Sequence, residues 1–203
     1  DQSYLKPCLS YLAIRHLCYC MLCLISNTSK SASSLHDMHA AMSGRFMHIF
    51  NHCITSVALF YFFGLLEQRR CLRGSDAFGG LMQRTPLLCS WMSVAMFSSL
   101  GLPGLNGFIG EFLIFKGSFA LAAGFTAVAV LGLLFTAVAL LRAMQALFSG
   151  PLVESCAALP DLRRGELLVI IPITLLMLAL GLAPQLLLSF VNSTIPQTTR
   201  PFG

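Results

Sequence analysis

Long apolar stretches separated by short polar ones run through nearly the whole chain. A helix rises about 1.5 Å per residue, so about 20 apolar residues cross the roughly 30 Å hydrocarbon core of a membrane. We predict six spanning stretches, at residues 8–25, 47–66, 86–100, 105–121, 122–148 and 167–191. The fourth and fifth almost touch, so five or seven spans also fit the pattern. The chain is therefore predicted to be an all-α integral membrane protein.

Polar segments divide these stretches. Residues 26–34, 67–84 and 149–166 are predicted to be loops, and residues 192–203 a polar tail. We expect residues 1–148 to form one unit of about five spans, followed by the loop at 149–166 and a final membrane helix at 167–191. The loop at 67–84 carries four arginines, and positive loops tend to face the cytoplasm or the matrix. Loops this short leave the orientation open.

The composition agrees with a membrane protein. Of the 203 residues, 56% are hydrophobic and 10% are charged, whereas soluble domains carry about a quarter charged residues. The net charge of +5 indicates topology and contact with anionic lipids, not nucleic-acid binding, because no basic run is interleaved with aromatic residues. Of the eight cysteines, only Cys20 and Cys23 have the spacing CxxC, and they lie inside an apolar stretch without a second pair of cysteines, which favours packing over a metal site. Signatures of phosphate, flavin or nicotinamide binding are absent from the sequence, so no cofactor is expected in this chain.

Glu111 is the most informative single residue, because it lies inside an apolar stretch. Ionisable side chains at membrane depth usually pair with another charge or line an ion path. The segment just before it, residues 101–110, contains four glycines and Pro103, which predicts an interrupted helix. Such interruptions are tolerated only in protein or beside a wet cavity. Carboxylate and interruption together indicate ion or proton transport. The alternatives are a carboxylate at a helix end that reaches the membrane interface, and a static ion pair.

Other polar side chains accompany Glu111 in the apolar stretches. His52 is interpreted as a proton-relay residue, since histidine titrates in the useful range; a hydrogen-bonded packing role is the alternative. His48 lies one turn earlier, but the sequence shows no third ligand for a metal. Lys116 follows Glu111 by about 7.5 Å along a helix, and either influences its charge or extends to the membrane surface.

Three basic side chains surround the first predicted span. Lys6 precedes a proline at the start of the stretch, where an interfacial anchor is the more usual role of lysine than a relay. Arg15 lies well inside the stretch with His16 beside it. A buried arginine needs a partner, which we expect on another helix or another chain. No partner for Arg15 or Glu111 is evident from the sequence.

Four motifs resemble the antiporter-like subunits of respiratory complex I. Residues 101–119, GLPGLNGFIGEFLIFKGSF, are similar to the family's G-x-P-G-x-x-x-F-x-G-E-F segment. The stretch from His52 to LLEQRR at 65–70, with GGL at 79–81, resembles its H-G-x-x-x-A-x-L-F helix and L-x-E-R end. PDLRRGEL at 160–167 and GLAPQ at 181–185 resemble the last helix. LKPCLSYLAIRHL at 5–17 is similar to D-x-K-R-x-I-A-Y-S-S-x-S-H-M, without the acid and the Ser-Ser pair.

The resemblance implies roles for the residues that match. Glu111 takes the place of the terminal proton-pathway glutamate on a discontinuous helix, and this glutamate favours subunit 4 over the subunit 2 and 5 types, which have lysine there. His52 takes the place of the central-axis histidine, Lys6 that of the relay lysine, and His16 that of the motif's histidine. Lys116 stands where the family usually has an apolar residue.

The resemblance also implies a setting. The chain would be the carboxy-terminal half of NADH dehydrogenase subunit 4, the second of two inverted repeats. We expect a separate chain to supply the amino-terminal half, and other membrane-arm subunits and lipids as further partners. The expected location is the mitochondrial inner membrane, with the bacterial plasma membrane as the alternative. NADH, flavin, iron–sulfur clusters and ubiquinone would be bound elsewhere in an H⁺-translocating NADH:ubiquinone reductase. Two alternatives are a subunit of a cation/proton antiporter or membrane-bound hydrogenase, and a structural fragment that no longer pumps.

Overall fold

The computed structural model describes residues 2–28, 35–69, 79–152 and 159–198. All regular structure in these ranges is helical, as the sequence predicts. A helix pairs its backbone polar groups internally, which a membrane interior requires. The elements are α1 (Gln2–Thr28), α2 (Leu35–Gln68), α3 (Leu81–Arg84), α4 (Pro86–Ser99), α5 (Asn106–Leu121), α6 (Ala123–Phe148), α7 (Arg164–Leu182) and α8 (Gln185–Thr198).

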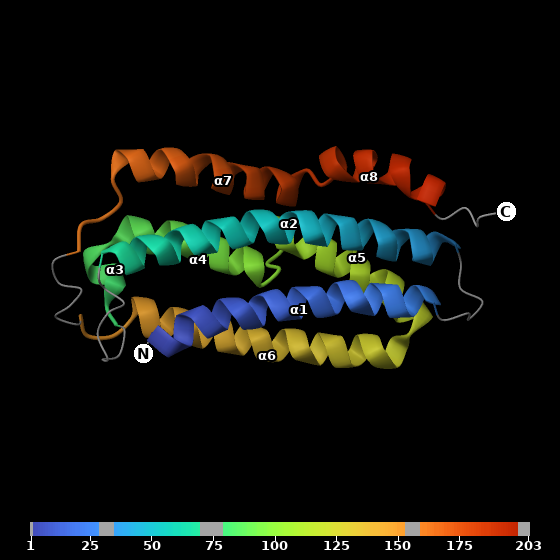
Figure 1. Cartoon of the computed structure of the whole chain (residues 1–203), viewed down its shortest axis with the longest axis horizontal. Coiled ribbons are helices and arrows are strands. Elements are labelled where there is room, and N and C mark those ends of the chain that lie inside the picture. Colours follow the sequence, from blue (N-terminus) through green and yellow to red (C-terminus); the bar gives the residue numbers. More distant parts are fainter. Residues whose placement is uncertain (1, 29–34, 70–78, 153–158, 199–203) are drawn as a thin grey trace.

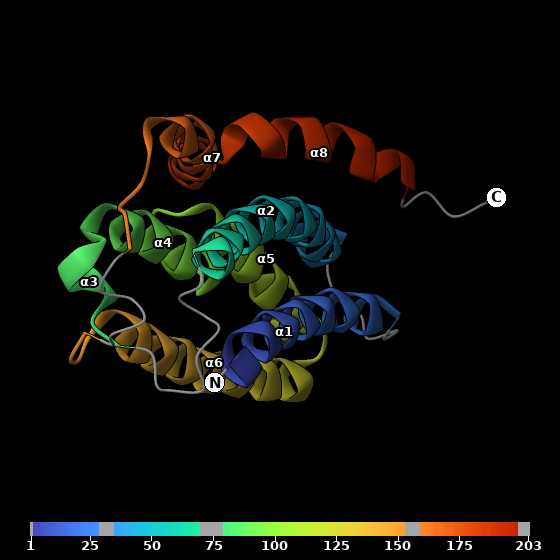
Figure 2. The same cartoon turned by 60° about the vertical axis from the view of Figure 1, so that its left-hand side comes forward.

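The helices form three layers (Figures 1 and 2). α2, α4 and α5 make up the middle layer, α1 and α6 cover one side of it, and α7 with α8 covers the other. The outer helices expose much of their apolar surface: only 11% of α6 and 28% of α7 is buried inside the bundle. Apolar side chains such as Phe135 and Leu168 therefore face outward. A membrane or a neighbouring protein would cover them.

Four helices are long and apolar enough to cross a membrane, judged over the described residues. They are the segments Leu9–Ser26, His39–Gln68, Ala123–Phe148 and Arg164–Leu182. α4 and α5 are shorter and follow one another along the long axis, beside α2 (Figure 1). The third and fourth predicted stretches thus run in the same direction, as two halves of one interrupted segment. This is the discontinuous helix that the sequence predicts, but a count of six separate spans is not confirmed.

The last predicted span, at residues 167–191, is wrong as a single helix. α7 ends at Leu182 and α8 begins at Gln185, with Ala183 and Pro184 between them. Proline lacks a backbone N–H and disfavours the helical conformation in the residue before it, and Ala183 has φ −125° and ψ 63°. The predicted polar tail is also partly helical, because α8 continues to Thr198.

Two predicted loops are shorter than the sequence pattern indicated. α1 continues to Thr28, and α2 begins at Leu35, twelve residues before the predicted span at 47–66. The polar residues at these ends extend the helices beyond their apolar parts. The loop predicted at 67–84 contains the short helix α3. α5 and α6, which the sequence left almost fused, are separated at Ala122, where φ is −154° and ψ is 67°.

The end of the bundle that holds α3 is tied together by two acidic side chains. Arg69, just beyond α2, donates to the Glu166 carboxylate of α7 at 2.5 and 2.7 Å and to the Pro160 carbonyl at 2.7 Å. Asp161 accepts from the backbone N–H groups of Leu87 and Leu88, both at 3.1 Å. A carboxylate at a helix N-terminus pairs free N–H groups and favours the helix dipole. The polar loop before α7 thereby holds the start of α4.

Glycine brings α2 and α5 into close backbone contact. A Cβ atom added at Gly44 would lie 2.7 Å from the backbone of Ile114, and one at Gly110 would lie 2.7 Å from the Cα of His48. Small residues at helix interfaces in membranes permit this approach and replace a hydrophobic driving force by van der Waals packing. Since α2 runs through the middle of the bundle, this contact fixes the position of α5 relative to the other helices.

We predict that Gly110→Ala destabilises the protein by about 1–3 kcal/mol, the usual cost of overpacking. The added methyl group meets backbone atoms of His48, which cannot rotate away as a side chain does. The free energy of unfolding is measured by titration of the purified protein with a denaturing detergent.

Gly64→Ala is the matched control. Gly64 lies in α2, the helix that Gly110 of α5 contacts, but a Cβ atom at Gly64 meets nothing within 4 Å. Alanine favours the helix over glycine by about 1 kcal/mol, so this variant should be as stable as the parent or slightly more stable. Equal stability of the two variants would contradict the close contact.

Candidate functional site: a buried Arg–Glu–His cluster beside a helix break

The break between α4 and α5 places two residues in the left-handed backbone region. Gly101 has φ 72° and Gly104 has φ 95°, a conformation that favours glycine. Pro103 lies between them and has no N–H to donate. The chain resumes a helix at Asn106. The sequence prediction of an interruption before Glu111 is confirmed.

Polar side chains from three helices form hydrogen bonds beside the break. Asn51 of α2 donates to the Asn106 carbonyl at 2.6 Å, and Asn106 donates in return to the Asn51 carbonyl at 3.3 Å. The Ser98 hydroxyl donates to the Asn106 side-chain oxygen and lies 3.1 Å from the Thr55 hydroxyl. Buried polar groups that lack a partner are costly. These hydrogen bonds link α2, α4 and α5 beside the break, while the turn pairs the last carbonyls of α4 through Gly101 N–H to Ser98 and Leu102 N–H to Phe97.

Arg15 and Glu111 form an ion pair in the interior of the bundle. Arg15 Nη2 lies 3.3 Å from Glu111 Oε1, and the two residues expose only 8% and 4% of their surface. The same guanidinium nitrogen donates to the carbonyl of Ser99, at the end of α4. Arg15 also lies over the Tyr19 ring, 5.4 Å from its centroid, within the range of a cation–π contact. α1 is thus bound to both sides of the break.

Glu111 is held next to the break by the shape of the backbone. A Cβ atom at Gly101 would lie 2.5 Å from Glu111 Oε2, so the carboxylate occupies the space where another residue would have its side chain. Glu111 Oε1 has no hydrogen-bond partner among the described residues, although the ion pair faces it. The carboxylate therefore has one oxygen against the turn and one oxygen directed toward Arg15 and His16.

Two buried histidines continue the cluster. His16 Nδ1 lies 2.9 Å from His48 Nε2 and 4.0 Å from Glu111 Oε1. Arg15 Nη2 lies 3.0 Å from His16 Nε2. Since arginine can only donate, His16 Nε2 must accept, and the proton of a neutral His16 ring is then on Nδ1. That proton points toward His48 and Glu111.

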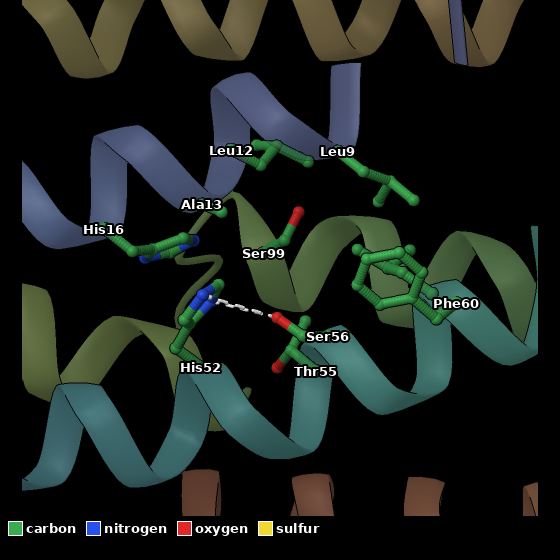
Figure 3. Close-up of a pocket in the computed structure, with 10 residues that line it drawn as sticks. Leu9, Leu12, Ala13, His16, His52, Thr55, Ser56, Phe60 and Ser99 are labelled. Carbon is green, nitrogen blue, oxygen red and sulfur yellow. Dashed lines mark hydrogen bonds between the residues drawn. The ribbon is translucent and has the colours of Figure 1, made fainter. Parts of the chain in front are cut away.

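His52 extends the cluster toward a small cavity (Figure 3). Its ring stacks on His16 with a centroid distance of 4.1 Å, and its nitrogens lie 3.2 and 3.4 Å from the Ser56 hydroxyl. His16, His52, Ser56 and Ser99 line the cavity together with apolar side chains of α1 and α2. The cavity volume is about 20 Å³, enough for one water molecule.

The structure brings together four of the six residues singled out from the sequence. Glu111, His52, His16 and Arg15 lie in one cluster. Lys116 does not join it: its side chain is exposed on α5 and has no ion pair with Glu111, which favours extension to the membrane surface. Lys6 belongs to α1, but its side chain lies outside the described residues.

Arg15 and Glu111 are each other's partner, so the partner of Arg15 lies on another helix of this chain, one of the two options that the sequence left open. The sequence could not show this, since 96 positions separate them. Sequence reasoning also missed His48, which is more deeply buried than His52 and directly bonded to His16. A signal was present: Gly44 lies one helical turn before His48, and both face α5.

Chemically, the cluster is a set of titratable groups within proton-transfer reach. His16 and His48 share a hydrogen bond, the Glu111 carboxylate is next to them, and a water-sized cavity adjoins His16 and His52. One fixed positive charge, that of Arg15, faces the carboxylate. Such an arrangement can store a proton and pass it between α1, α2 and α5.

Comparison with known proteins places the chain in a family. Residues 1–136 match the family described as NADH:quinone oxidoreductase/Mrp antiporter, transmembrane. The chain therefore belongs to the NADH:quinone oxidoreductase/Mrp antiporter transmembrane family.

Relatives and solved structures agree with this assignment. NADH-quinone oxidoreductase subunit M of Rickettsia conorii is 29% identical over 195 residues, which are 96% of this chain and 38% of that protein. The subunit M of Mycobacterium tuberculosis is 33% identical over 164 residues, 79% of this chain and 29% of that protein. A chain of respiratory complex I from Thermus thermophilus with bound NADH shares the fold, with a TM-score of 0.54 and 22% identity over 89% of this chain and 42% of that chain. This chain thus spans less than half the length of the relatives it matches.

We predict that Arg15→Met lowers the free energy of unfolding by about 3–5 kcal/mol, because it leaves the Glu111 carboxylate buried without its cation. The same substitution should cost far less in a Glu111→Gln background, where no buried charge is left. The four proteins of this double-mutant cycle are compared by denaturing-detergent titration. If the two substitutions act additively, the ion pair does not couple α1 to α5.

Proposed function

We propose that this chain is part of the proton-translocating membrane arm of respiratory complex I, as a subunit of the type called 4 or M. Its relatives from Rickettsia conorii and Mycobacterium tuberculosis carry the name NADH-quinone oxidoreductase subunit M. This supports complex I over a separate cation/proton antiporter or a membrane-bound hydrogenase. The chain would then act as part of an NADH:ubiquinone reductase in which NADH, flavin, iron–sulfur clusters and ubiquinone are bound by other subunits.

The observation that carries the proposal is the buried Arg15–Glu111 pair with histidines beside it. Burying a charge pair at membrane depth is costly and seldom improves stability over apolar side chains. Its position against a helix break, with His16 and His48 in hydrogen-bond contact, fits proton transfer better than a fixed structural pair. A structural remnant that fills the bundle would not need this concentration of titratable groups.

The proposed route uses the cavity as a link. His52 and His16 stack and both border a space for one water molecule, so a water there would connect the two rings. From His16 a proton reaches Glu111 or His48 through short side-chain movements, over starting distances of 4.0 and 2.9 Å. Arg15 balances the negative charge of the carboxylate when the proton leaves. Glu111 is thereby the proposed storage site, and His52 and His16 are relay residues.

The fold supports a wider arrangement as part of the proposal. The three-layer bundle with one interrupted segment would be one of two inverted repeats, and the working site of such proteins lies where the repeats meet. The first repeat, other membrane-arm subunits and lipids would then cover the exposed faces of α6 and α7. Lys6 would be the relay lysine near that contact. An energy-converting membrane, of a mitochondrion or a bacterium, is the proposed location.

We predict that Glu111→Gln strongly lowers the number of protons translocated per electron in the complex that contains this chain. Glutamine has nearly the same shape and keeps an oxygen facing Arg15, so the complex should still assemble, but it cannot carry the proton. The ratio is measured in reconstituted vesicles, with electron transfer from NADH to quinone recorded in parallel. Glu111→Asp should retain part of the activity, since the acid remains and only the reach is shorter.

His52→Ala provides the comparison. A water in the enlarged cavity can replace a relay histidine, so this variant should lose less pumping than Glu111→Gln. Lys116→Gln, at an exposed position on the same helix, should leave pumping unchanged. Unchanged pumping in the Glu111→Gln complex would support a structural remnant instead.

The separate amino-terminal chain stays a prediction, and mass spectrometry of the purified complex tests it. We expect a second polypeptide that contains the other family repeat. The intact mass of the polypeptide with this sequence is read in the same spectrum. A single polypeptide that contains both repeats would refute a split subunit and leave the proposed function of the site unaffected.

A further inference from the structure

Three buried side chains of the cluster have the right identity and spacing to hold a metal ion. One donor atom each from His16, His48 and Glu111 lies within 4.8 Å of the others. The measured separations are 2.9 Å between the two imidazole nitrogens and 4.0 Å from His16 Nδ1 to Glu111 Oε1. In a tetrahedral site with bonds of about 2.0–2.1 Å, ligand atoms are about 3.3 Å apart. The observed distances lie on both sides of this value, so small side-chain rotations would complete the site.

We propose that His16, His48 and Glu111 form a binding site for Zn²⁺. Two imidazoles and one carboxylate are the ligand types that this ion prefers, whereas Mg²⁺ and Ca²⁺ prefer oxygen ligands throughout. The three ligands come from α1, α2 and α5, which are already packed around the site. A fourth coordination position would be left for water. The Oε1 atom of Glu111 is buried without a hydrogen-bond partner among the described residues, and coordination would satisfy it.

Arg15 is the competitor of the metal. Its guanidinium lies 3.3 Å from Glu111 Oε1 and 3.0 Å from His16 Nε2. The positive charge of Arg15 is therefore already beside the ligands that a metal cation would bind. Coordination through His16 Nδ1 moves the ring proton to Nε2, which then no longer accepts from Arg15. The guanidinium would have to leave both groups and keep its bond to the Ser99 carbonyl. Zn²⁺ therefore has to compete with the Arg15 guanidinium for Glu111 and His16.

Binding itself does not depend on the proposed function, but its consequence does. A metal held by His16, His48 and Glu111 occupies the lone pairs that would accept a proton. Zn²⁺ and proton transfer at this site exclude each other. If the chain translocates protons as proposed, Zn²⁺ inhibits the step at this cluster.

The first experiment measures binding directly in the purified complex that contains this chain. The protein is equilibrated with Zn²⁺, separated from free ion by gel filtration, and its zinc content is determined by mass spectrometry. His48→Asn should bind one zinc ion fewer per chain. His52→Asn is the matched control, since it removes a neighbouring histidine that is not a ligand, and it should bind as many ions as the parent. Equal zinc content of the parent and His48→Asn overturns the proposal.

A second variant tests the competition. Arg15→Gln removes the internal cation and keeps the ligands, so it should bind Zn²⁺ more tightly, on the order of tenfold or more. A structural defect would weaken binding instead. Weaker or equal affinity in Arg15→Gln, measured on complex that elutes intact in gel filtration, contradicts the assigned site.

X-ray absorption by zinc in the unsubstituted complex decides the matter even if a variant does not fold. The zinc gained by equilibration should show nitrogen and oxygen neighbours with imidazole scattering and no sulfur. Sulfur neighbours would assign the ion to cysteines and refute the site. Zinc that binds as described without lowering proton translocation would refute only the proposed function at this cluster.

Discussion

The buried ion pair between Arg15 and Glu111 is the interaction on which the rest of the interior depends. Two opposite charges removed from water must lie close together, or each costs several kcal/mol. Here the pair joins α1 to α5, and Arg15 adds a bond to the last carbonyl of α4. Three helices are thus fixed by one guanidinium. The histidines follow from it, because the donor-only character of arginine determines which nitrogen of His16 accepts and which carries the proton.

The pair can exist only because the backbone makes room for it. The break removes a turn of helix where the Glu111 carboxylate lies, and Arg15 pairs the Ser99 carbonyl that this leaves free at the end of α4. The contact between α2 and α5 then brings His48 against Gly110, one residue from the glutamate. The close packing of α2 against α5 and the gap between α4 and α5 therefore have the same effect. They place charged and titratable groups together without filling the space between them with side-chain carbon.

Much of this architecture was predictable from the sequence, because the membrane imposes a simple rule on composition. Apolar stretches, the interruption near Pro103 and the unusual position of Glu111 are all local patterns, and the structure confirms them. The ends of the helices were less predictable. Polar residues extended α2 well beyond its apolar part, and Pro184 divided the last stretch although its apolar character continued on both sides.

The sequence predicted which residues the site contains, but not how they contact one another. Arg15 and Glu111 were each expected to need a partner, but their pairing is a long-range contact that no spacing in the sequence expresses. His48 and His52 lie one turn apart and are equivalent in the pattern. Which of them meets His16 by a hydrogen bond and which by stacking depends on the rotation of α2 against α1 and α5. Only the packed bundle determines that rotation.

Glycine is required at position 101 for two separate reasons, and these reasons constrain the evolution of the sequence differently. Its positive φ serves the turn, while the missing side chain serves the carboxylate of Glu111. A lineage that lost the acid would release the second requirement and keep the first. Glycine would then persist at position 101 in proteins that had already lost the acid of the site. When related sequences are surveyed for a working site, the glycine-rich turn is therefore a poor marker, and the acid together with the arginine that faces it is the informative pair.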